Sequence, residues 1–362
     1  MIRKAIVSTF CTWSSYGSVL QAYAFRLFLN EMGVDSTLLL SIKQKQYVLP
    51  EYVTRKQHFL KTAVFSLLNL FFEKKRKQRF KKINQFIETN LDVKYFDDYN
   101  FLLEMDFNSN IFISGSDQVF HPSVCDPAFF LDFVPHHNLK VSYAGSLGSL
   151  KIPNSNKEKF LKLINNFDFL SLRERDAAEF VSSFYQKPIY VNADPTLLIE
   201  KEKWMALSKK YSSVQKFKKY YLVYAIYWDK NYNKLLKQLK RKTGCMIVVI
   251  SDGLTSIFHD KMICDASIEE FLWLIKNAEG IVTSSFHGAC FSIIFNKPVS
   301  IVINPASPSR LASLVDRFEI PCVPINELDA YCFEYGSINK KIAEARAEAE
   351  EYVNTFLHYG KK

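Results

Sequence analysis

The stretch GIVTSSFHGA at residues 280–289 passes from a strand pattern to a helix pattern with only Ser-Ser-Phe-His-Gly between them. In α/β proteins such a junction lies at the carboxyl end of the sheet, where ligands bind. The free N–H groups and the dipole at the start of a helix attract anions. We therefore expect Ser284, Ser285 and Gly288 to bind an anionic group there.

His287 stands in the same junction, and histidine changes its charge near neutral pH. It is our candidate for a proton carrier or a hydrogen-bond donor beside the bound anion. The sequence leaves a second interpretation open, in which Ser285 only caps the helix and His287 is structural.

Strands and helices alternate outward from this junction in both directions, which predicts parallel sheets flanked by helices. A chain of 362 residues exceeds the size of one hydrophobic core, so we expect domains at 1–198 and 199–336 and a helix at 337–362. The predicted strands are residues 5–10, 37–40, 111–113, 140–144, 169–172, 189–191, 220–227, 246–250, 280–283 and 299–303. The predicted helices are residues 19–32, 158–166, 174–183, 232–242, 267–277 and 289–295, with a last helix capped by Ser337.

A second polar junction, GSDQ at residues 115–118, follows the predicted strand 111–113. Gly115 allows a ligand to approach the backbone, and Ser116, Asp117 and Gln118 offer a hydroxyl, a carboxylate and an amide. An ordinary turn in which Ser116 or Asp117 caps a helix is equally compatible with the pattern.

Two further strand ends carry charged residues. Arg173 follows the predicted strand 169–172, and its guanidinium suits a carboxylate or a phosphate. Taken alone, this segment favours a salt-bridged helix start, with Glu174 and Asp176 near the helix dipole. Asp194 precedes Pro195, and we expect it to hold a rigid turn, with a role as a base as the alternative.

The composition excludes several classes of protein. The seven cysteines show no C-x-x-C spacing, there is no apolar signal region, and no apolar run is long enough to span a bilayer, so we expect a cytoplasmic protein. The sequence also lacks the glycine-rich motif of dinucleotide-binding proteins, the Walker phosphate-binding loop, the His-Glu-x-x-His motif of zinc proteases and the Gly-x-Ser-x-Gly motif of serine hydrolases.

The basic residues of the chain are concentrated in one part of the sequence. Nearly all of the net charge of +10 comes from one segment, since residues 55–82 hold ten Lys or Arg and one acid. This segment lacks an aromatic stacking module, so we expect no nucleic-acid binding.

Six motifs in order resemble the polysaccharide pyruvyl transferase family over roughly residues 5–320. They are YGSVLQAYA (16–24), GSDQV (115–119), SYA (142–144), SLRE (171–174), DPTLL (194–198) and SFHG (285–288). The resemblance implies two Rossmann-like domains whose parallel sheets face each other across a cleft, as in glycosyltransferase-B proteins. It also implies a C-terminal helix that returns to the first domain.

The resemblance further implies transfer of pyruvate from phosphoenolpyruvate to two hydroxyls of one sugar, which gives a pyruvate ketal and phosphate. Arg173 is carried over as a donor-binding residue and His287 as a catalytic one; Tyr16, Gly17 and Ser18 are expected near the substrate. We choose Asp117 as the base, with Asp194 behind it. Phosphoenolpyruvate is the co-substrate, and no metal or other cofactor is expected.

The acceptor implied by the resemblance is a saccharide in a polysaccharide or in its lipid-linked precursor. Two rival functions remain open on the same architecture: a glycosyltransferase that uses a nucleotide sugar, and a non-catalytic sugar-binding protein.

The basic segment suggests a surface contact as well. Apolar residues dominate 59–72 and basic residues dominate 74–82, within a predicted helical segment at 55–90. An amphipathic basic hairpin at 55–82 could bind an anionic membrane weakly and peripherally. The alternative is that its apolar face packs on the first domain and its lysines are solvated.

Overall fold

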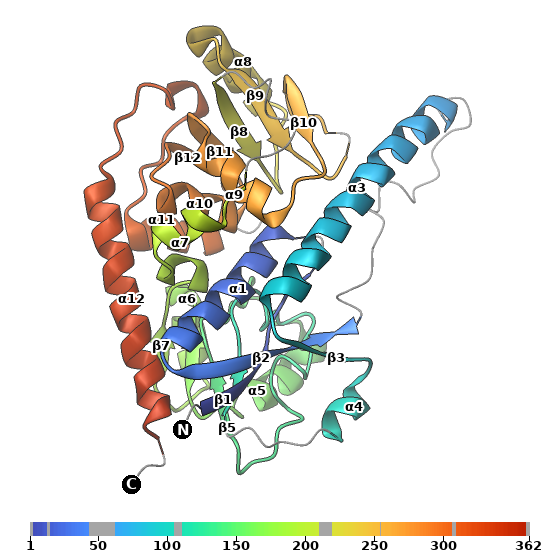
Figure 1. The fold of residues 1–362 in the computed structure, drawn as a ribbon. Helices are drawn as coiled ribbons and strands as arrows, with labels where there is room; N and C mark the ends of the chain where they lie inside the picture. Colours follow the sequence, from blue (N-terminus) through green and yellow to red (C-terminus); the bar gives the residue numbers. More distant parts are fainter. Residues whose placement is uncertain are drawn as a thin grey trace.

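The computed structural model describes residues 3–12, 15–42, 62–104, 111–209, 219–253, 255–305 and 309–359, with only the backbone described for 62–71 (Figure 1). Two five-stranded parallel sheets form the centres of two α/β domains. The first has the spatial order β3 (Val93–Phe96), β2 (Val34–Ser41), β1 (Arg3–Ser8), β4 (Ile111–Ser114) and β5 (Leu139–Ser142). The second has the order β10 (Lys261–Ile263), β9 (Met246–Ile250), β8 (Tyr220–Tyr224), β11 (Gly280–Thr283) and β12 (Val299–Ile301).

The first sheet continues into a short parallel pair. Strand β6 (Leu170–Leu172) pairs with β7 (Ile189–Val191), and single bridges join Phe169 to Val141 and Leu172 to Gly145. The spatial order of the first domain is therefore 3-2-1-4-5-6-7, with β1 at the point where the order reverses. Ligands of doubly wound sheets bind at the carboxyl ends of the strands beside such a point.

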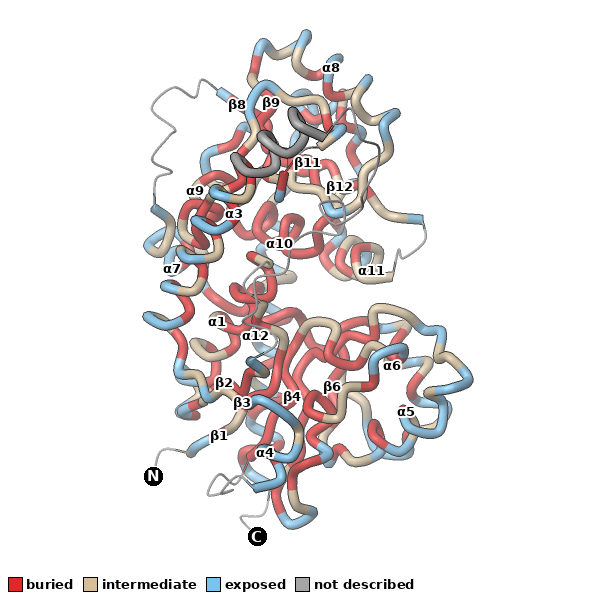
Figure 2. Tube along the Cα trace, turned by 90° about the vertical axis from the view of Figure 1, so that its right-hand side faces the viewer, coloured by how far each residue is buried: buried red, intermediate tan, exposed pale blue. Residues whose placement is uncertain are grey.

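The helices that cover the sheets follow the predicted alternation. They include α1 (Tyr16–Glu31), α5 (Lys157–Ile164), α6 (Arg175–Ser182), α8 (Tyr232–Thr243), α9 (Ile268–Lys276) and α10 (Phe286–Ile294). The structure adds α11 (Ser309–Phe318), which was not predicted. Helix α9 begins with a capping box, since the hydroxyl of Ser267 accepts from the N–H of Glu270 and the Glu270 carboxylate accepts from the N–H of Ser267. Every residue of α10 is buried, and Figure 2 shows this helix in the middle of the molecule.

The last helix, α12 (Tyr335–Leu357), returns to the first domain, as the resemblance implies (Figure 1). The Tyr352 hydroxyl donates to the carbonyl of Ser142 at 2.7 Å, and Arg346 donates to the carbonyl of Leu198 at 2.7 Å. The helix starts at Tyr335, so the prediction that Ser337 caps it is wrong. Its first turns face the second domain and its last turns face the first, which ties the two together.

The basic segment forms part of one long helix, α3 (Thr62–Asn90), which extends from the first domain along the second (Figure 1). The predicted hairpin is therefore wrong over residues 62–82, and the remainder of that prediction, at 55–61, lies outside the described residues. Arg79 pairs with the carboxylate of Asp252, while Lys82 donates to Glu270 at 2.7 Å and to the carbonyl of Asp265 at 2.9 Å. We call these contacts the α3 clamp.

None of the helices in the described part of the chain combines the length and the apolar character that crossing a bilayer requires.

Candidate functional site

The junction after β11 forms the predicted helix start, but its hydroxyls serve the backbone. Ser285 is the N-cap of α10, and its hydroxyl accepts from the N–H of Gly288 at 3.3 Å. The Ser284 hydroxyl accepts from the N–H groups of Ile226 and Tyr227 and donates to the carbonyl of Tyr227. Ser284 therefore holds the loop after β8, and the prediction that it donates to a ligand is not supported by this geometry.

His287 lies in the first turn of α10 with 7% of its surface exposed. Its Nδ1 edge lies against Gly17 of the first domain, so closely that a β-carbon on Gly17 would overlap the ring. Its Nε2 atom lies 3.6 Å from Oδ2 of Asp194, which is longer than a hydrogen bond. Nε2 is buried and has no hydrogen-bond partner among the residues that the structure describes.

Asp194 is the centre of the site, and its exposure is 1%. Oδ1 accepts from the N–H and the hydroxyl of Thr196 at 3.0 and 2.8 Å. Oδ2 accepts from Ser116 at 3.2 Å and from Nη1 of Arg173 at 3.0 Å. Burial acts to raise the pKa of Asp194, but His287, Arg173 and the Thr196 N–H outweigh burial and hold that pKa well below its usual range. A carboxylate bound this way positions its neighbours and is a poor base.

Arg173 lies at the end of β6, and its exposure is 4%. Its Nε donates to Glu174 at 3.0 Å, its Nη1 donates to Asp194, and its guanidinium lies 4.1 Å from the centre of the Phe286 ring. Its Nη2 is buried and has no partner among the described residues. The salt-bridged interpretation is therefore confirmed, whereas the ligand interpretation stays a prediction, for which Nη2 is the available nitrogen. We call Ser116, Arg173, Glu174, Asp194 and His287 the Arg173 cluster.

Ser116 is the residue of the GSDQ turn after β4 that belongs to this cluster. The Ser116 hydroxyl lies within hydrogen-bond distance of Asp194 and of the carbonyl of Ala144. Gly115 lies against Thr9 with no room for a β-carbon, so this glycine serves close packing of the strands.

Asp117 points toward the second domain from the same turn. Its backbone has a φ of 71°, in the left-handed region, and its Oδ1 accepts from the N–H of Gln118 at 3.0 Å. That Oδ1 also lies 3.8 Å from Nη1 of Arg310, which belongs to α11. Gln118 packs over Gly148, away from the Arg173 cluster.

The YGS motif supports the site and does not line it. The Tyr16 hydroxyl donates to the carbonyl of Ala266 at 2.9 Å, and its ring stacks on Phe271 with centroids 4.5 Å apart, so Tyr16 joins the domains. Ser18 exchanges hydrogen bonds with Thr12 and Ser15 and shapes the loop after β1. The prediction of substrate contact for Tyr16 and Ser18 has no support in these contacts, whereas Gly17 touches His287.

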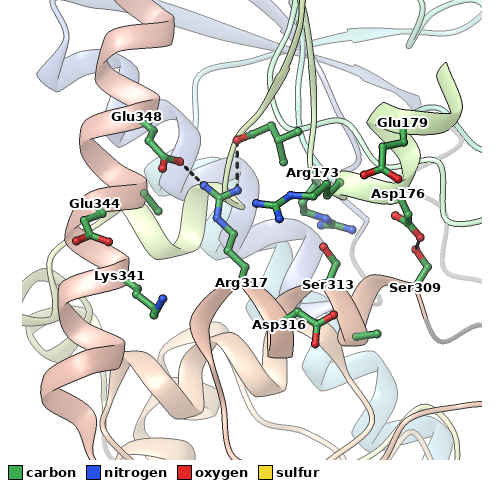
Figure 3. A pocket seen from close by; sticks show the side chains of 14 residues that line it. Arg173, Asp176, Glu179, Ser309, Ser313, Asp316, Arg317, Lys341, Glu344 and Glu348 are labelled. Atoms are coloured by element: carbon green, nitrogen blue, oxygen red, sulfur yellow. Dashed lines mark hydrogen bonds and ion pairs between the residues drawn. The ribbon is translucent and has the colours of Figure 1, made fainter. Parts of the chain in front are cut away.

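A cavity of about 760 Å³ opens beside the cluster between α6, α11 and α12 (Figure 3). Arg317 crosses it, donating to Glu348 at 2.6 Å and to the carbonyl of Val191 at 3.3 Å. The wall is polar and of mixed charge, and it includes Arg173, Glu179, Ser313, Asp316, Lys341 and Glu344. The cavity and the cluster share Arg173.

The sequence analysis missed Arg310 and the whole of α11. The helix had a usable signal, because Leu311, Leu314 and Phe318 are buried and recur at helical spacing. The partners of Asp194, by contrast, have no sequence signal, because Ser116 and Arg173 come from separate strand ends.

In the described ranges, no group of three or more His, Cys, Asp or Glu side chains is arranged to hold a metal ion.

Comparisons with known proteins agree on the fold. A model of the family described as polysaccharide pyruvyl transferase matches residues 16–305. No curated protein matches the chain significantly. UDP-GlcNAc 2-epimerase from Neisseria meningitidis bound to UDP-GlcNAc has a TM-score of 0.55 and 14% identity, with coverage of 99% of this chain and 100% of that chain. Arabidopsis thaliana UGT89C1 complexed with quercetin has a TM-score of 0.54 and 10% identity, with coverage of 99% and 100%. At such identities the likeness shows the fold alone, which is glycosyltransferase-B-like, as predicted.

Proposed function

The chain belongs to the polysaccharide pyruvyl transferase family, and from this premise we propose that it transfers pyruvate from phosphoenolpyruvate to two hydroxyls of one sugar. The observation that carries the proposal is a pair of buried nitrogens beside Asp194, Nη2 of Arg173 and Nε2 of His287, which have no hydrogen-bond partner in the described part of the chain. A buried donor without a partner costs free energy, so such donors are retained where a ligand completes them. An anionic substrate that also accepts a proton would bond to Nη2 of Arg173 and receive the proton from Nε2 of His287.

The proposed chemistry assigns a role to each group. Arg173 binds the phosphate or the carboxylate of phosphoenolpyruvate through Nη2. His287 gives the proton on Nε2 to the methylene carbon, which becomes a methyl group, while a sugar oxygen bonds to the adjacent carbon. Asp117 accepts the proton of that hydroxyl.

The second half of the reaction closes the ketal. The phosphate leaves with the electron pair of its bond to carbon, and the second sugar hydroxyl bonds to the same carbon and gives its proton to the phosphate. One phosphate is released for each ketal, and water is neither consumed nor formed. Asp194 stabilises the charged imidazole and keeps Arg173 in place. Phosphoenolpyruvate is consumed as a co-substrate, and the scheme needs no metal or other cofactor.

We assign the saccharide acceptor to the 760 Å³ cavity beside Arg173 (Figure 3). Its size is that of a pocket for a small organic ligand. Carboxylates such as Glu179 and Glu344, together with the hydroxyl of Ser313, suit the hydroxyls of a sugar. A lipid-linked acceptor could place its sugar there and leave its lipid outside.

The test is incubation of the purified protein with phosphoenolpyruvate and a panel of saccharides. Phosphate release that depends on the saccharide, together with the mass of a pyruvate ketal on the sugar, is the expected result. Calorimetry compares the binding of phosphoenolpyruvate with that of UDP-GlcNAc. Binding of the nucleotide sugar alone would replace the proposal by a glycosyltransferase, and binding of neither donor would leave only a sugar-binding role.

A further inference from the structure

Arg310 reaches from the second domain toward the first at the edge of the Arg173 cluster. It is the second residue of α11, and its Nη1 lies 3.8 Å from Oδ1 of Asp117. About a quarter of its side chain is exposed, at 27%. At 3.8 Å the contact with Asp117 is too long for a hydrogen bond. No hydrogen bond of Arg310 occurs among the residues described, so the five N–H donors of its guanidinium are available to a ligand.

The charge of Arg173 is not sufficient by itself to bind the donor. The charge of Arg173 is already offset by two hydrogen-bonded carboxylates, those of Glu174 and Asp194. That group alone therefore has no excess positive charge with which to bind a donor that carries both a phosphate and a carboxylate. A second guanidinium is needed, and Arg310 supplies one from the second domain, whereas Arg317 is already bonded to Glu348 and to the carbonyl of Val191.

The two arginines also repel each other. Burial lowers the pKa of Arg310 and the neighbouring Arg173 lowers it further, while the carboxylates of Asp117 and Glu174 act in the opposite direction without offsetting the two. Burial and the Arg310 charge likewise lower the pKa of His121, which lies on the first-domain side. A guanidinium close to another cation and without a hydrogen bond is stabilised when an anion lies between the two.

We infer that Arg310 is a second donor-binding residue, which pairs with the anionic donor jointly with Arg173 and leaves Asp117 when the donor binds. The inference rests on the proposed function, since the donor is taken to be phosphoenolpyruvate. Arg310 comes from one domain and Arg173 from the other, so a donor held by both draws the two sides of the site together. Release of Asp117 from Arg310 frees that carboxylate to accept the hydroxyl proton.

The experiment is calorimetric titration of phosphoenolpyruvate into the full-length protein and three variants. Arg310→Met is expected to weaken the affinity roughly tenfold to a hundredfold, the effect of losing a charge-assisted bond to an anion. Arg310→Lys keeps the charge and is expected to lose less. Arg241→Met removes the same charge from the exposed face of α8 and is the matched control, with unchanged affinity expected.

Asp117→Asn separates ligand binding from a merely structural bridge. If Arg310 binds the donor, loss of its competing carboxylate leaves the affinity equal or higher. If Arg310 only ties the domains through Asp117, then Asp117→Asn weakens binding as much as Arg310→Met does, and the inference is overturned.

The remaining outcomes are also decisive. Equal affinities of the wild type and Arg310→Met overturn the inference and leave the proposed function standing. A wild type that does not bind phosphoenolpyruvate overturns the proposed function, and the inference with it. If Arg310→Met does not fold, as judged by its melting transition, Arg310→Lys and Asp117→Asn decide the question.

Discussion

Two groups of charged side chains join the domains, and they differ in how closely their partners approach. In the α3 clamp, Lys82 donates to Glu270 at 2.7 Å and to the carbonyl of Asp265 at 2.9 Å. At the Arg173 cluster, the contacts that cross between domains are longer. His287 lies 3.6 Å from Asp194, and Arg310 lies 3.8 Å from Asp117.

We interpret this difference in distance as a difference in role: the short contacts hold the domains together, and the long contacts leave donors for a ligand. A cross-domain pair at hydrogen-bond distance has already formed the bond that stabilises it. A pair near 3.7 Å keeps its donors for another partner, and one of those donors, Nε2 of His287, is buried without a partner among the described residues. In the proposed mechanism the α3 clamp sets the mutual position of the domains, and that position brings Arg173 and His287 of the cluster, together with Arg310, to one anion.

The largest expected effect is that of His287→Ala on turnover. Removal of a positioned acid lowers the rate roughly 10²–10⁴-fold. Phosphate release in the presence of acceptor is the measurement, and the melting transition shows that the variant remains folded. His358→Ala, at the exposed end of α12, is the control and is expected to keep full turnover. Wild-type turnover in His287→Ala would exclude it as the acid.

Arg173→Ala is expected to act on both binding and stability. It leaves the carboxylates of Glu174 and Asp194 buried without their cation, which costs about 3–5 kcal/mol of unfolding free energy in comparable buried pairs. Donor binding should be lost as well. Urea unfolding and calorimetry measure the two effects.

Arg346→Ala is the matched control for Arg173→Ala. Arg346 pairs with Glu31 and Glu350 at half-exposed positions and donates to the carbonyl of Leu198, so its loss is expected to cost about 1–2 kcal/mol, less than the loss of Arg173, and to leave donor affinity unchanged. Equal losses of stability in the two variants would remove the distinction between a buried and an exposed pair.

Gly17→Ala tests the position of His287 without removing it. The added β-carbon would overlap the imidazole ring, so the ring must move. A displacement of about 1 Å at a catalytic group costs roughly 10²-fold in rate. Donor affinity should change little, because Arg173 and Arg310 are untouched. Gly336→Ala is the control, since no atom lies within 4 Å of the position of its β-carbon, and unchanged turnover in both variants would contradict the role given to Gly17.

The alternation of strands and helices could be predicted because buried parallel strands are short apolar runs and their covering helices show a helical period. The predicted strands at 111–113, 189–191, 246–250 and 280–283 agree with the structure to within one residue at each end. The start of α10 at Phe286 was placed too late, at Ala289, because Gly288 disfavours a helix in isolation. In the folded protein Gly288 lies against Thr283 and Tyr224, where a larger residue would not fit.

The sequence predicts the site only to the extent that its residues follow the ends of predicted strands. Arg173, Asp194, Ser116 and His287 were expected at the carboxyl ends of strands, and the structure brings them together there. The residue type alone does not tell whether a serine hydroxyl is bonded to the backbone or is available to a ligand. Ser284 shows this, because its bonds to the loop after β8 depend on a segment almost sixty residues away.

The smallest expected effect concerns α3 and anionic membranes. Residues 74–82 form one basic run in the sequence. In the structure, however, Arg79 and Lys82 face the second domain and belong to the α3 clamp. Lys74 and Lys81 are exposed, and each basic residue near an anionic surface contributes about 1 kcal/mol to attraction. We therefore expect weak co-sedimentation with vesicles containing phosphatidylglycerol at low salt, and none at high salt, where the charges are screened. Replacement of both lysines by glutamine should abolish this binding and leave turnover on a water-soluble saccharide unchanged. Equal binding to neutral vesicles, or binding that survives the double replacement, would show that Lys74 and Lys81 do not attract the membrane. The exposed face of α3 would then have no membrane-binding role that distinguishes it from the face in the α3 clamp.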